Sequence, residues 1–400
     1  MIKISPRAEN VQFSPIRKFV PLLQETKKRG LEVFEVHIGQ PDLPTPSVML
    51  ARIKSFPDKI LTYTPSPGIT PLCQAWSKYF KDCDLNFGTN ELISTTGGSE
   101  AILFAFAAVC QPREELLVFE PFYTNYNGYA AMAGIKLNPV KTKAEDGFHL
   151  PSKREIEKKI NKKTRGIIVC NPNNPTGTVY TVQELKIIVE LAKKYNLFIL
   201  ADETYREFVY EGKHVSMATF KTIEQQIIVL DSVSKKFSAC GARIGVLASK
   251  NKKIIEAALK FAQARLSLPS VEQWAVVPAL ENSKKYTHQA FKEYKKRRDV
   301  VFAEAKSIEE ATVIKPNGAF YLMIKIPWLK NSDSFAKWLL TNFSHQNKTV
   351  MIAPGDGFYA SRKSGKNEFR LAFVLAAPKM KEAIKILKIA LKKYKKINKS

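Results

Sequence analysis

Residues 166–177 read GIIVCNPNNPTG, residues 197–205 read LFILADETY, and residues 226–235 read QIIVLDSVSK. Each stretch begins with a short apolar run and continues into polar side chains. Short apolar runs separated by helical patterns are typical of parallel strands that helices cover on both faces. Ligands of such sheets bind beyond the carboxyl ends of the strands. The three stretches therefore predict an α/β fold in which an amide, a carboxylate and a lysine share one crevice.

The sequence around these stretches is consistent with that fold. Residues 183–195 have the spacing of an amphipathic helix, and residues 116–119 form an earlier apolar run. Pro-rich loops occupy residues 39–71, and a long charged helix from about residue 290 precedes a hairpin-like segment at 318–322. We expect a large domain, with a mainly parallel sheet between helices, and a smaller α/β domain from both termini. The expected boundaries are 1–44 for the N-terminal segment of the small domain, 45–290 for the large domain and 291–400 for the small C-terminal domain.

The charge balance raises the question of an anionic partner. The chain has 400 residues, with 63 Lys and Arg against 37 Asp and Glu, which gives a net charge of +26. Hydrophobic residues make up 45% of the chain, a share that excludes a disordered polycation. Nucleic acid, an anionic membrane and a phosphorylated small molecule are therefore the candidate partners.

The positions of the lysines argue against nucleic acid and against an anionic membrane as the partner. The basic run at 292–299 falls on an expected solvated helix face, and no helix-turn-helix segment precedes the motifs, so a nucleic-acid binder is disfavoured. Ile384, Leu387 and Leu391 recur at helical spacing within residues 379–399. We expect this stretch to be a C-terminal helix packed on the small domain rather than a helix on a membrane surface.

The cysteines, histidines and N-terminus bear on the compartment. The five cysteines are scattered and odd in number, and the five histidines show no HxxxH or HExxH spacing, so no metal site is expected. Residues 1–15 are interrupted by polar residues before an apolar signal region develops, and no apolar run approaches the roughly 20 residues of a membrane span. We expect a cytoplasmic protein.

The polar residues after the three apolar runs suit an aromatic nitrogen cofactor. Pyridoxal phosphate withdraws electrons only while its ring nitrogen is protonated, which requires a carboxylate, and its aldehyde is held by a lysine amine. Asp202 and Lys235 fit these two requirements. Asn174 and Tyr205 are placed to donate hydrogen bonds to the ring oxygen, which lowers the basicity of the lysine linkage.

The cofactor's phosphate requires a cradle for an anion. Ser232 lies three residues before Lys235, and Arg243 lies eight residues after it. Gly98 and Ser99 open an apolar helical stretch, and backbone amides at the start of a helix bind phosphate well. The Gly-Gly-Ser stretch at 97–99 is a weak signal alone, whereas the ordered series of motifs from residue 171 to residue 245 is a strong one.

In this order, the motifs resemble those of the class I/II, fold-type-I pyridoxal-phosphate aminotransferases, most closely the bacterial aspartate-aminotransferase-like branch. The matching stretches run from IGQPD at 38–42 through YTPSPG at 63–68 to FRL at 369–371. The resemblance implies a fold-type-I homodimer that binds pyridoxal 5′-phosphate and transfers amino groups by a ping-pong mechanism.

The resemblance also implies a role for each matching residue. Lys235 would hold the cofactor and act as the general base, and Asp202 would pair with the ring nitrogen. Tyr63 would reach the phosphate of the neighbouring subunit, and Arg370 would clamp the substrate's α-carboxylate. The remaining implied contacts are Asn174 and Tyr205 to the ring oxygen, Ser232, Arg243 and the amides of Gly98 and Ser99 to the phosphate, Tyr123 stacked on the ring, and Gly39 and Asn174 against the substrate carboxylate.

The sequence specifies the substrate less precisely than the cofactor. The best match is aspartate with 2-oxoglutarate; the alternatives on the same fold are a β-lyase and an aminotransferase for aromatic or neutral amino acids. Gln40 and Ser99 depart from the acidic residue and the lysine that some relatives carry at these positions. A cation for a distal carboxylate would therefore come from Arg265 or Arg17, if the site has one.

Overall fold

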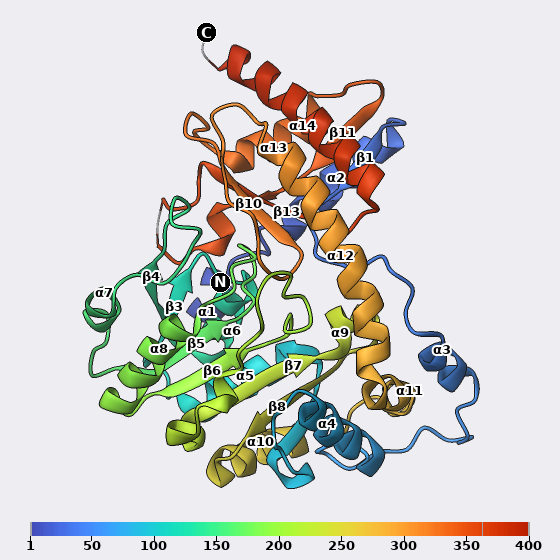
Figure 1. The fold of residues 1–400 in the computed structure, drawn as a ribbon, viewed down its shortest axis with the longest axis vertical. Helices are drawn as coiled ribbons and strands as arrows, with labels where there is room; N and C mark the ends of the chain where they lie inside the picture. Colours follow the sequence, from blue (N-terminus) through green and yellow to red (C-terminus); the bar gives the residue numbers. More distant parts are fainter. Residues whose placement is uncertain (1, 362, 399–400) are drawn as a thin grey trace.

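The computed structural model describes residues 2–361 and 363–398, so Lys399 of the predicted C-terminal helix lies outside the described residues. Its central feature is a seven-stranded sheet, with neighbouring strands parallel except around β8, which is antiparallel to both neighbours (Figure 1). All four apolar runs of the sequence lie in this sheet, which confirms the predicted α/β class. The strand order is β2 (Leu92–Thr96), β8 (Ile244–Ser249), β7 (Ile227–Ser232), β6 (Phe198–Asp202), β5 (Thr164–Cys170), β3 (Glu115–Glu120) and β4 (Lys136–Lys141).

Both faces of the sheet are buried, as an uninterrupted apolar strand requires. Ile167 and Val169 of β5 pack into one hydrophobic core, whereas Ile168 between them packs into a second core on the opposite face. The helices that surround the sheet are α3 (Ser47–Lys54), α4 (Thr70–Asp82), α5 (Gly97–Val109), α6 (Asn125–Ala133), α7 (Lys153–Glu157), α8 (Val182–Tyr195), α9 (Val233–Lys236), α10 (Lys252–Arg265) and α11 (Ser270–Glu281).

A second unit brings the two ends of the chain together. β1 (Glu32–Glu35) pairs in parallel with β11 (Lys348–Met351), so an N-terminal strand joins a C-terminal one. The other strands of this unit form a four-stranded sheet. Their order is β12 (Ala353–Pro354), β13 (Glu368–Ala372), β10 (Tyr321–Lys325) and β9 (Thr312–Val313). Its helices include α2 (Val20–Lys28), α13 (Ser332–Thr341) and α14 (Ala377–Ile397), and the short α1 (Pro6–Asn10) precedes them along the chain.

The C-terminal helix packs as expected. Ile384, Leu387 and Leu391 of α14 are at most 3% exposed and belong to the core of this second unit. The domain boundaries at residues 44 and 290 stay a prediction. Among the described residues, none of the helices combines the length and apolarity that crossing a bilayer requires.

Three local predictions need correction. The long helix α12 (Ser283–Ala305) begins well before residue 290. The Pro-rich loop region 39–71 contains α3, whose Met49 is buried against the large core. Residues 318–322 form no local hairpin, because Gly318 bridges Val209 across the two units and the chain then enters β10.

Candidate active site

A cavity of about 580 Å³ lies at the carboxyl ends of the parallel strands, a size suited to a cofactor with its substrate. Asn174 reaches it from the loop after β5, Asp202 from the last position of β6, and Lys235 from α9, which follows β7 directly. The structure thus brings the amide, the carboxylate and the lysine into one cavity. Its lining also includes Gly39, Gly98, Ser99, Tyr123, Tyr205, Ser232, Arg243 and Arg370 from the sequence analysis.

The loop that carries Asn174 is fixed by its own polar residues. Asn173 donates its backbone N–H to Thr178 O at 2.8 Å, and the Thr176 hydroxyl donates to Asn173 Oδ1 at 3.0 Å. Gly177 has φ of +73°, and a Cβ there would lie 2.4 Å from Pro316 Cβ. Only glycine fits this turn, so the Asn-Pro-Thr-Gly composition fixes the position of Asn174.

Asp202 is a buried carboxylate held by two hydroxyl groups. It is 6% exposed; Tyr126 Oη donates to Oδ2 at 2.7 Å, and Thr204 Oγ1 donates to Oδ1 at 2.8 Å. Burial raises its pKa above the usual value, against the opposing effect of these hydrogen bonds. A carboxylate in this setting binds a cationic N–H in the cavity favourably, because that partner compensates for the lost hydration.

Lys235 also lines the cavity. Its Nζ donates to Gly39 O at 2.8 Å and lies 3.7 Å from Cys240 Sγ. Neither partner is a carboxylate, so the amine is not tied into an ion pair. It is therefore available for reaction with a ligand in the cavity.

Glycines allow Arg243 to lie against the first turn of α5. A Cβ on Gly97, which has φ of +70°, would lie 2.4 Å from Arg243 Nη2, and a Cβ on Gly245 would lie 2.4 Å from the Gly97 carbonyl carbon. Arg243 donates to Thr96 O at 3.3 Å and to Cys240 O at 3.1 Å. A guanidinium beside the N-terminus of a 13-residue helix makes a site for an anion, with Ser232 and Gly98 beside each other at its edge.

Arg370 lies at the other end of the cavity and is 2% exposed. Its Nη1 donates to Asn174 Oδ1 at 2.8 Å and its Nη2 to His37 O at 2.6 Å, while its Nε has no partner among the described residues. The guanidinium lies 4.3 Å from the ring centroid of Tyr321. Burial lowers the pKa of His37 to about 3, so this histidine adds no positive charge beside Arg370 at neutral pH. A planar, buried guanidinium of this kind suits a carboxylate.

Two tyrosines meet in the same cavity. Tyr205 Oη and Tyr321 Oη are 2.7 Å apart, and both side chains are buried. Tyr321 was not predicted as a site residue, because residues 318–322 were interpreted only as a hairpin-like segment of the fold. Tyr126, which holds Asp202, was missed as well, because nothing in its local sequence marks it as a partner of β6.

Tyr63 and Arg265 do not line the described cavity. Tyr63 is 81% exposed. Arg265 instead contacts Glu100 Oε2 at 3.2 Å and donates to Ser66 O at 2.6 Å. Arg17, the other candidate cation, does line the cavity. Within residues 2–361 and 363–398, no cluster of three or more His, Cys, Asp or Glu side chains is arranged to hold a metal ion.

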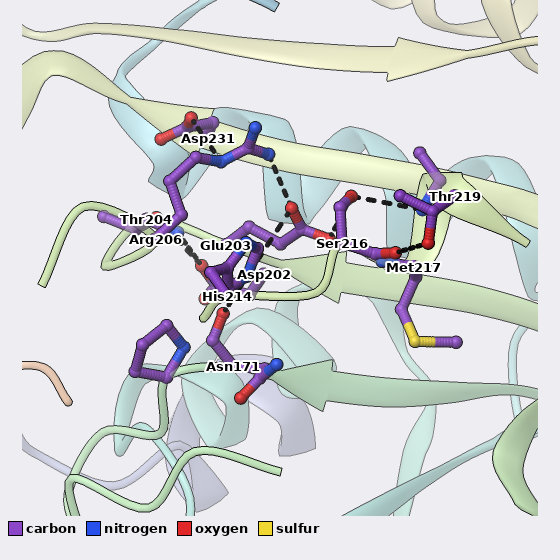
Figure 2. A network of polar contacts seen from close by, with 12 residues as sticks. Asn171, Asp202, Glu203, Thr204, Arg206, His214, Ser216, Met217, Thr219 and Asp231 are labelled. Carbon is purple, nitrogen blue, oxygen red and sulfur yellow. Dashed lines mark hydrogen bonds and ion pairs between the residues drawn. The ribbon is translucent and has the colours of Figure 1, made fainter. Parts of the chain in front are cut away.

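A buried network of charged side chains lies at the carboxyl ends of β6 and β7 (Figure 2). Glu203 follows Asp202 and contacts Arg206 Nη2 at 2.5 Å, and Ser216 Oγ donates to its other oxygen at 2.8 Å. Arg206 Nε lies 3.7 Å from Asp231 Oδ2, which joins the end of β6 to the end of β7. The side chains of these charged residues are at most 4% exposed. The network therefore fixes β6, which carries Asp202, relative to β7, which leads directly into α9 with Lys235.

Comparison with known proteins identifies the family of this chain. The family model described as aminotransferase class I and II matches residues 32–387. The chain is 32% identical to an aromatic-amino-acid aminotransferase 2 of Thermococcus litoralis, over 98% of this chain and 99% of that protein. It is 31% identical to an aspartate aminotransferase of Pyrococcus horikoshii, over 97% of each chain. A solved alanine aminotransferase from Pyrococcus furiosus shares the fold with a TM-score of 0.89 at 29% identity, covering 98% of this chain and 100% of that one.

The fold and the site define a fold-type-I transferase, and this chain belongs to the class I and II aminotransferase family. Its enzyme class is accordingly that of the aminotransferases. Enzymes of this family and fold use pyridoxal phosphate.

Proposed function

We propose that this chain binds pyridoxal 5′-phosphate and transfers an amino group between an L-amino acid and a 2-oxo acid by a ping-pong mechanism. The observation that carries the proposal is one cavity that combines Lys235, the buried carboxylate Asp202 and the buried guanidinium Arg370. The donor set fits the cofactor. The glycine cradle beside Arg243 suits its phosphate, and desolvated Asp202 suits its protonated ring nitrogen.

Each residue then has a defined task toward the cofactor. Lys235 holds the aldehyde, Asp202 keeps the ring nitrogen protonated, and Asn174 and Tyr205 donate to the ring oxygen. When bound, the cofactor supplies an electron-withdrawing ring that stabilises negative charge at the substrate's Cα. The further contacts that we propose are Gly98, Ser99, Ser232 and Arg243 to the phosphate and Tyr123 stacked on the ring.

The substrate's carboxylate sets the geometry of the proton transfer. Arg370 binds it through its guanidinium edge, with Asn174 and the backbone of Gly39 beside it. This orientation would place the Cα–H against the Lys235 amine, which would take the proton at Nζ and release it to the cofactor's C4′ carbon within the same half-reaction. The second half-reaction would run the same proton movements in reverse.

Aspartate with 2-oxoglutarate is the substrate pair that we propose. Arg17 supports this choice, because it lines the cavity and makes no ion pair with any described residue. Arg265 supports it less, since within this chain its guanidinium faces Glu100 and Ser66. Ser99 supplies no charge at the position where some relatives have a lysine, so Arg17 is the cation that we assign to a distal carboxylate.

We also propose a homodimer in the cytoplasm. Ile60, Leu61 and Tyr63 are 73%, 70% and 81% exposed in the single chain, which is a costly arrangement for an apolar loop unless a second copy covers it. Tyr63 would then reach the phosphate site of the second subunit. The five cysteines form no disulfide with one another, as a reducing compartment favours.

One experiment tests the proposed function. Purified protein loaded with pyridoxal phosphate is mixed with each amino acid in turn, and the loss of the cofactor's visible absorbance is followed together with keto acid formation. We expect aspartate and glutamate to react, and Lys235→Ala to abolish both signals. An undiminished rate in Lys235→Ala would refute the assignment of the lysine.

The same amino acid panel tests the substrate class. A reaction with aromatic or neutral amino acids and none with aspartate or glutamate contradicts the dicarboxylate assignment. Release of pyruvate and ammonia from cysteine-like substrates, without a keto acid acceptor, identifies a β-lyase instead.

A further inference from the structure

Tyr321 and Tyr205 form a buried pair of hydroxyl groups that lines the cavity. Tyr205 is 5% exposed and Tyr321 is 2% exposed, with 2.7 Å between the two hydroxyl oxygens. Each hydroxyl carries one proton, and this contact uses one of the two. The hydrogen bond between them therefore has a donor and an acceptor. Only the tyrosine that accepts keeps its own proton to donate to a third group.

Packing holds Tyr321 in its place. β10 pairs Met323 with Arg370 of β13, so Tyr321, two residues before Met323, faces the same side of the sheet as Arg370. A Cβ on Gly39 would lie 1.9 Å from Tyr321 Oη, which shows that the hydroxyl fills the space that a side chain at residue 39 would occupy. The ring is confined between Gly39 and Arg370, so its hydroxyl cannot swing away from Tyr205.

We propose that Tyr321 is a positioning residue that donates its hydroxyl proton to Tyr205 and thereby sets the proton affinity of the Lys235 nitrogen when the cofactor is bound. This inference rests on the proposed function, in which Tyr205 donates to the cofactor's ring oxygen. With Tyr321 as the donor, Tyr205 keeps its own proton for that oxygen, and the two hydrogen bonds strengthen each other.

The sign of the effect follows from the charge on the ring oxygen. A stronger hydrogen bond from Tyr205 stabilises that negative charge, so the oxygen holds the proton of the Lys235 nitrogen less firmly. Tyr321 therefore lowers the pH at which this nitrogen loses its proton. Burial, followed by the charge of Tyr321, holds the pKa of the Tyr205 hydroxyl well above its usual range, so Tyr205 stays a donor at working pH.

The test is a pH titration of the visible absorbance of the protein loaded with pyridoxal phosphate, without substrate. We expect Tyr321→Phe to raise the midpoint by about 0.3 pH unit or more, and Tyr205→Phe to raise it further. The double variant should have the midpoint of Tyr205→Phe alone, because Tyr321 acts through Tyr205. The dissociation constant of the cofactor, measured on the apoprotein, accompanies each titration.

Tyr210 offers a matched control. It is buried in the same core, and its hydroxyl donates to Ala319 O rather than to a group in the cavity. Tyr210→Phe should lower the unfolding temperature to a similar extent as Tyr321→Phe and leave the absorbance midpoint unchanged. If Tyr321→Phe does not fold, Tyr321→Met removes the same hydroxyl with a more adaptable apolar side chain and should raise the midpoint as well.

The outcomes separate this inference from the proposed function. A wild-type protein that shows no titrating absorbance with pyridoxal phosphate overturns the proposed function. A titrating wild type with an unchanged or lowered midpoint in Tyr321→Phe overturns only the role of Tyr321. A double variant whose midpoint exceeds that of Tyr205→Phe also overturns it, because Tyr321 would then act without Tyr205.

Discussion

Lys235 and Lys236 are consecutive residues whose side chains end in opposite environments. Lys235 Nζ donates to Gly39 O at 2.8 Å in the cavity, whereas Lys236 Nζ lies 2.8 Å from Asp231 Oδ2 with its side chain 0% exposed. Glu207 lies 3.0 Å from the same ammonium, and Tyr79 contacts it as well. A single step along α9 thus separates a reactive amine from a structural one.

This separation predicts that Lys236→Met affects stability far more than binding of the cofactor. Removing one partner of a buried ion pair leaves the other charge uncompensated, which costs about 3–5 kcal/mol in the free energy of unfolding. Urea denaturation of the apoprotein measures this loss. The double variant Lys236→Met/Asp231→Asn should recover part of it, since it removes both charges. A stability equal to that of the wild type in Lys236→Met contradicts the prediction.

Asp202→Asn should retain the fold and lose activity. The amide occupies the same space but carries no charge to keep the ring nitrogen protonated, so the rate of amino transfer should fall about a hundredfold or more. Steady-state kinetics measure the fall, and circular dichroism checks the fold. Tyr126→Phe removes only one hydrogen bond from Asp202 and should have a much smaller effect. Equal losses of rate in the two variants would show that the orientation of the Asp202 side chain, and not its charge, determines the rate.

The two arginines of the cavity should differ in their selectivity. Arg370→Lys loses the planar fork, so kcat/KM should fall by about 10- to 100-fold for every amino acid and 2-oxo acid tested. Arg17→Gln should reduce kcat/KM about three- to fivefold for substrates with a distal carboxylate, such as aspartate and glutamate; the loss is modest because this exposed charge is screened by solvent. Alanine serves as the reference substrate. A parallel loss for alanine in Arg17→Gln contradicts the assignment of Arg17 to a distal carboxylate.

Buried histidines should make the protein less stable in acid. Burial, followed by the charge of Arg206, lowers the pKa of His214 from 6.5 to about 3. Between these values the unfolded chain binds a proton that the folded chain does not, so this contribution destabilises the fold as the pH falls below about 6.5. At pH 5 the loss is about 2 kcal/mol for such a histidine.

His214→Gln tests this contribution. The amide can replace the contact of His214 Nε2 with Asn171 O, which measures 3.1 Å, but it binds no proton. We expect the difference in unfolding free energy between pH 7 and pH 5 to shrink by about 2 kcal/mol, measured by urea denaturation at both pH values. His288 is exposed on α12, and its replacement by Gln is the control. An unchanged pH dependence in His214→Gln refutes the prediction.

Local sequence was sufficient to predict the parts of the fold that depend on burial along a strand. The runs at 166–170 and 197–201 are apolar on both faces because helices cover both faces of β5 and β6. The position of Asn174, Asp202 and Lys235 in one cavity follows from that topology alone. The α3 helix was missed because prolines punctuate the region around it and its eight residues are too few to establish a helical period.

Contacts between distant segments were not predictable in this way. Tyr126 reaches Asp202 from a position 76 residues earlier in the chain, and Tyr205 meets Tyr321 from a position 116 residues earlier. Such pairs depend on how α6 and β10 pack, which no local pattern encodes. The buried position of Lys236 could not be predicted either. Two consecutive lysines are typical of a solvated loop, and the carboxylate partners of Lys236 are known only from the structure.

The hydrogen bond between Arg370 and Asn174 joins the two units of the molecule. Arg370 extends from β13, whose Phe369 and Leu371 belong to the core of the C-terminal unit, and Asn174 extends from the loop after β5 of the large sheet. Rotation of one unit relative to the other must change this 2.8 Å contact. A carboxylate that competes for this guanidinium should therefore bias the relative position of the two units, and a series of dicarboxylates of graded length would measure that coupling.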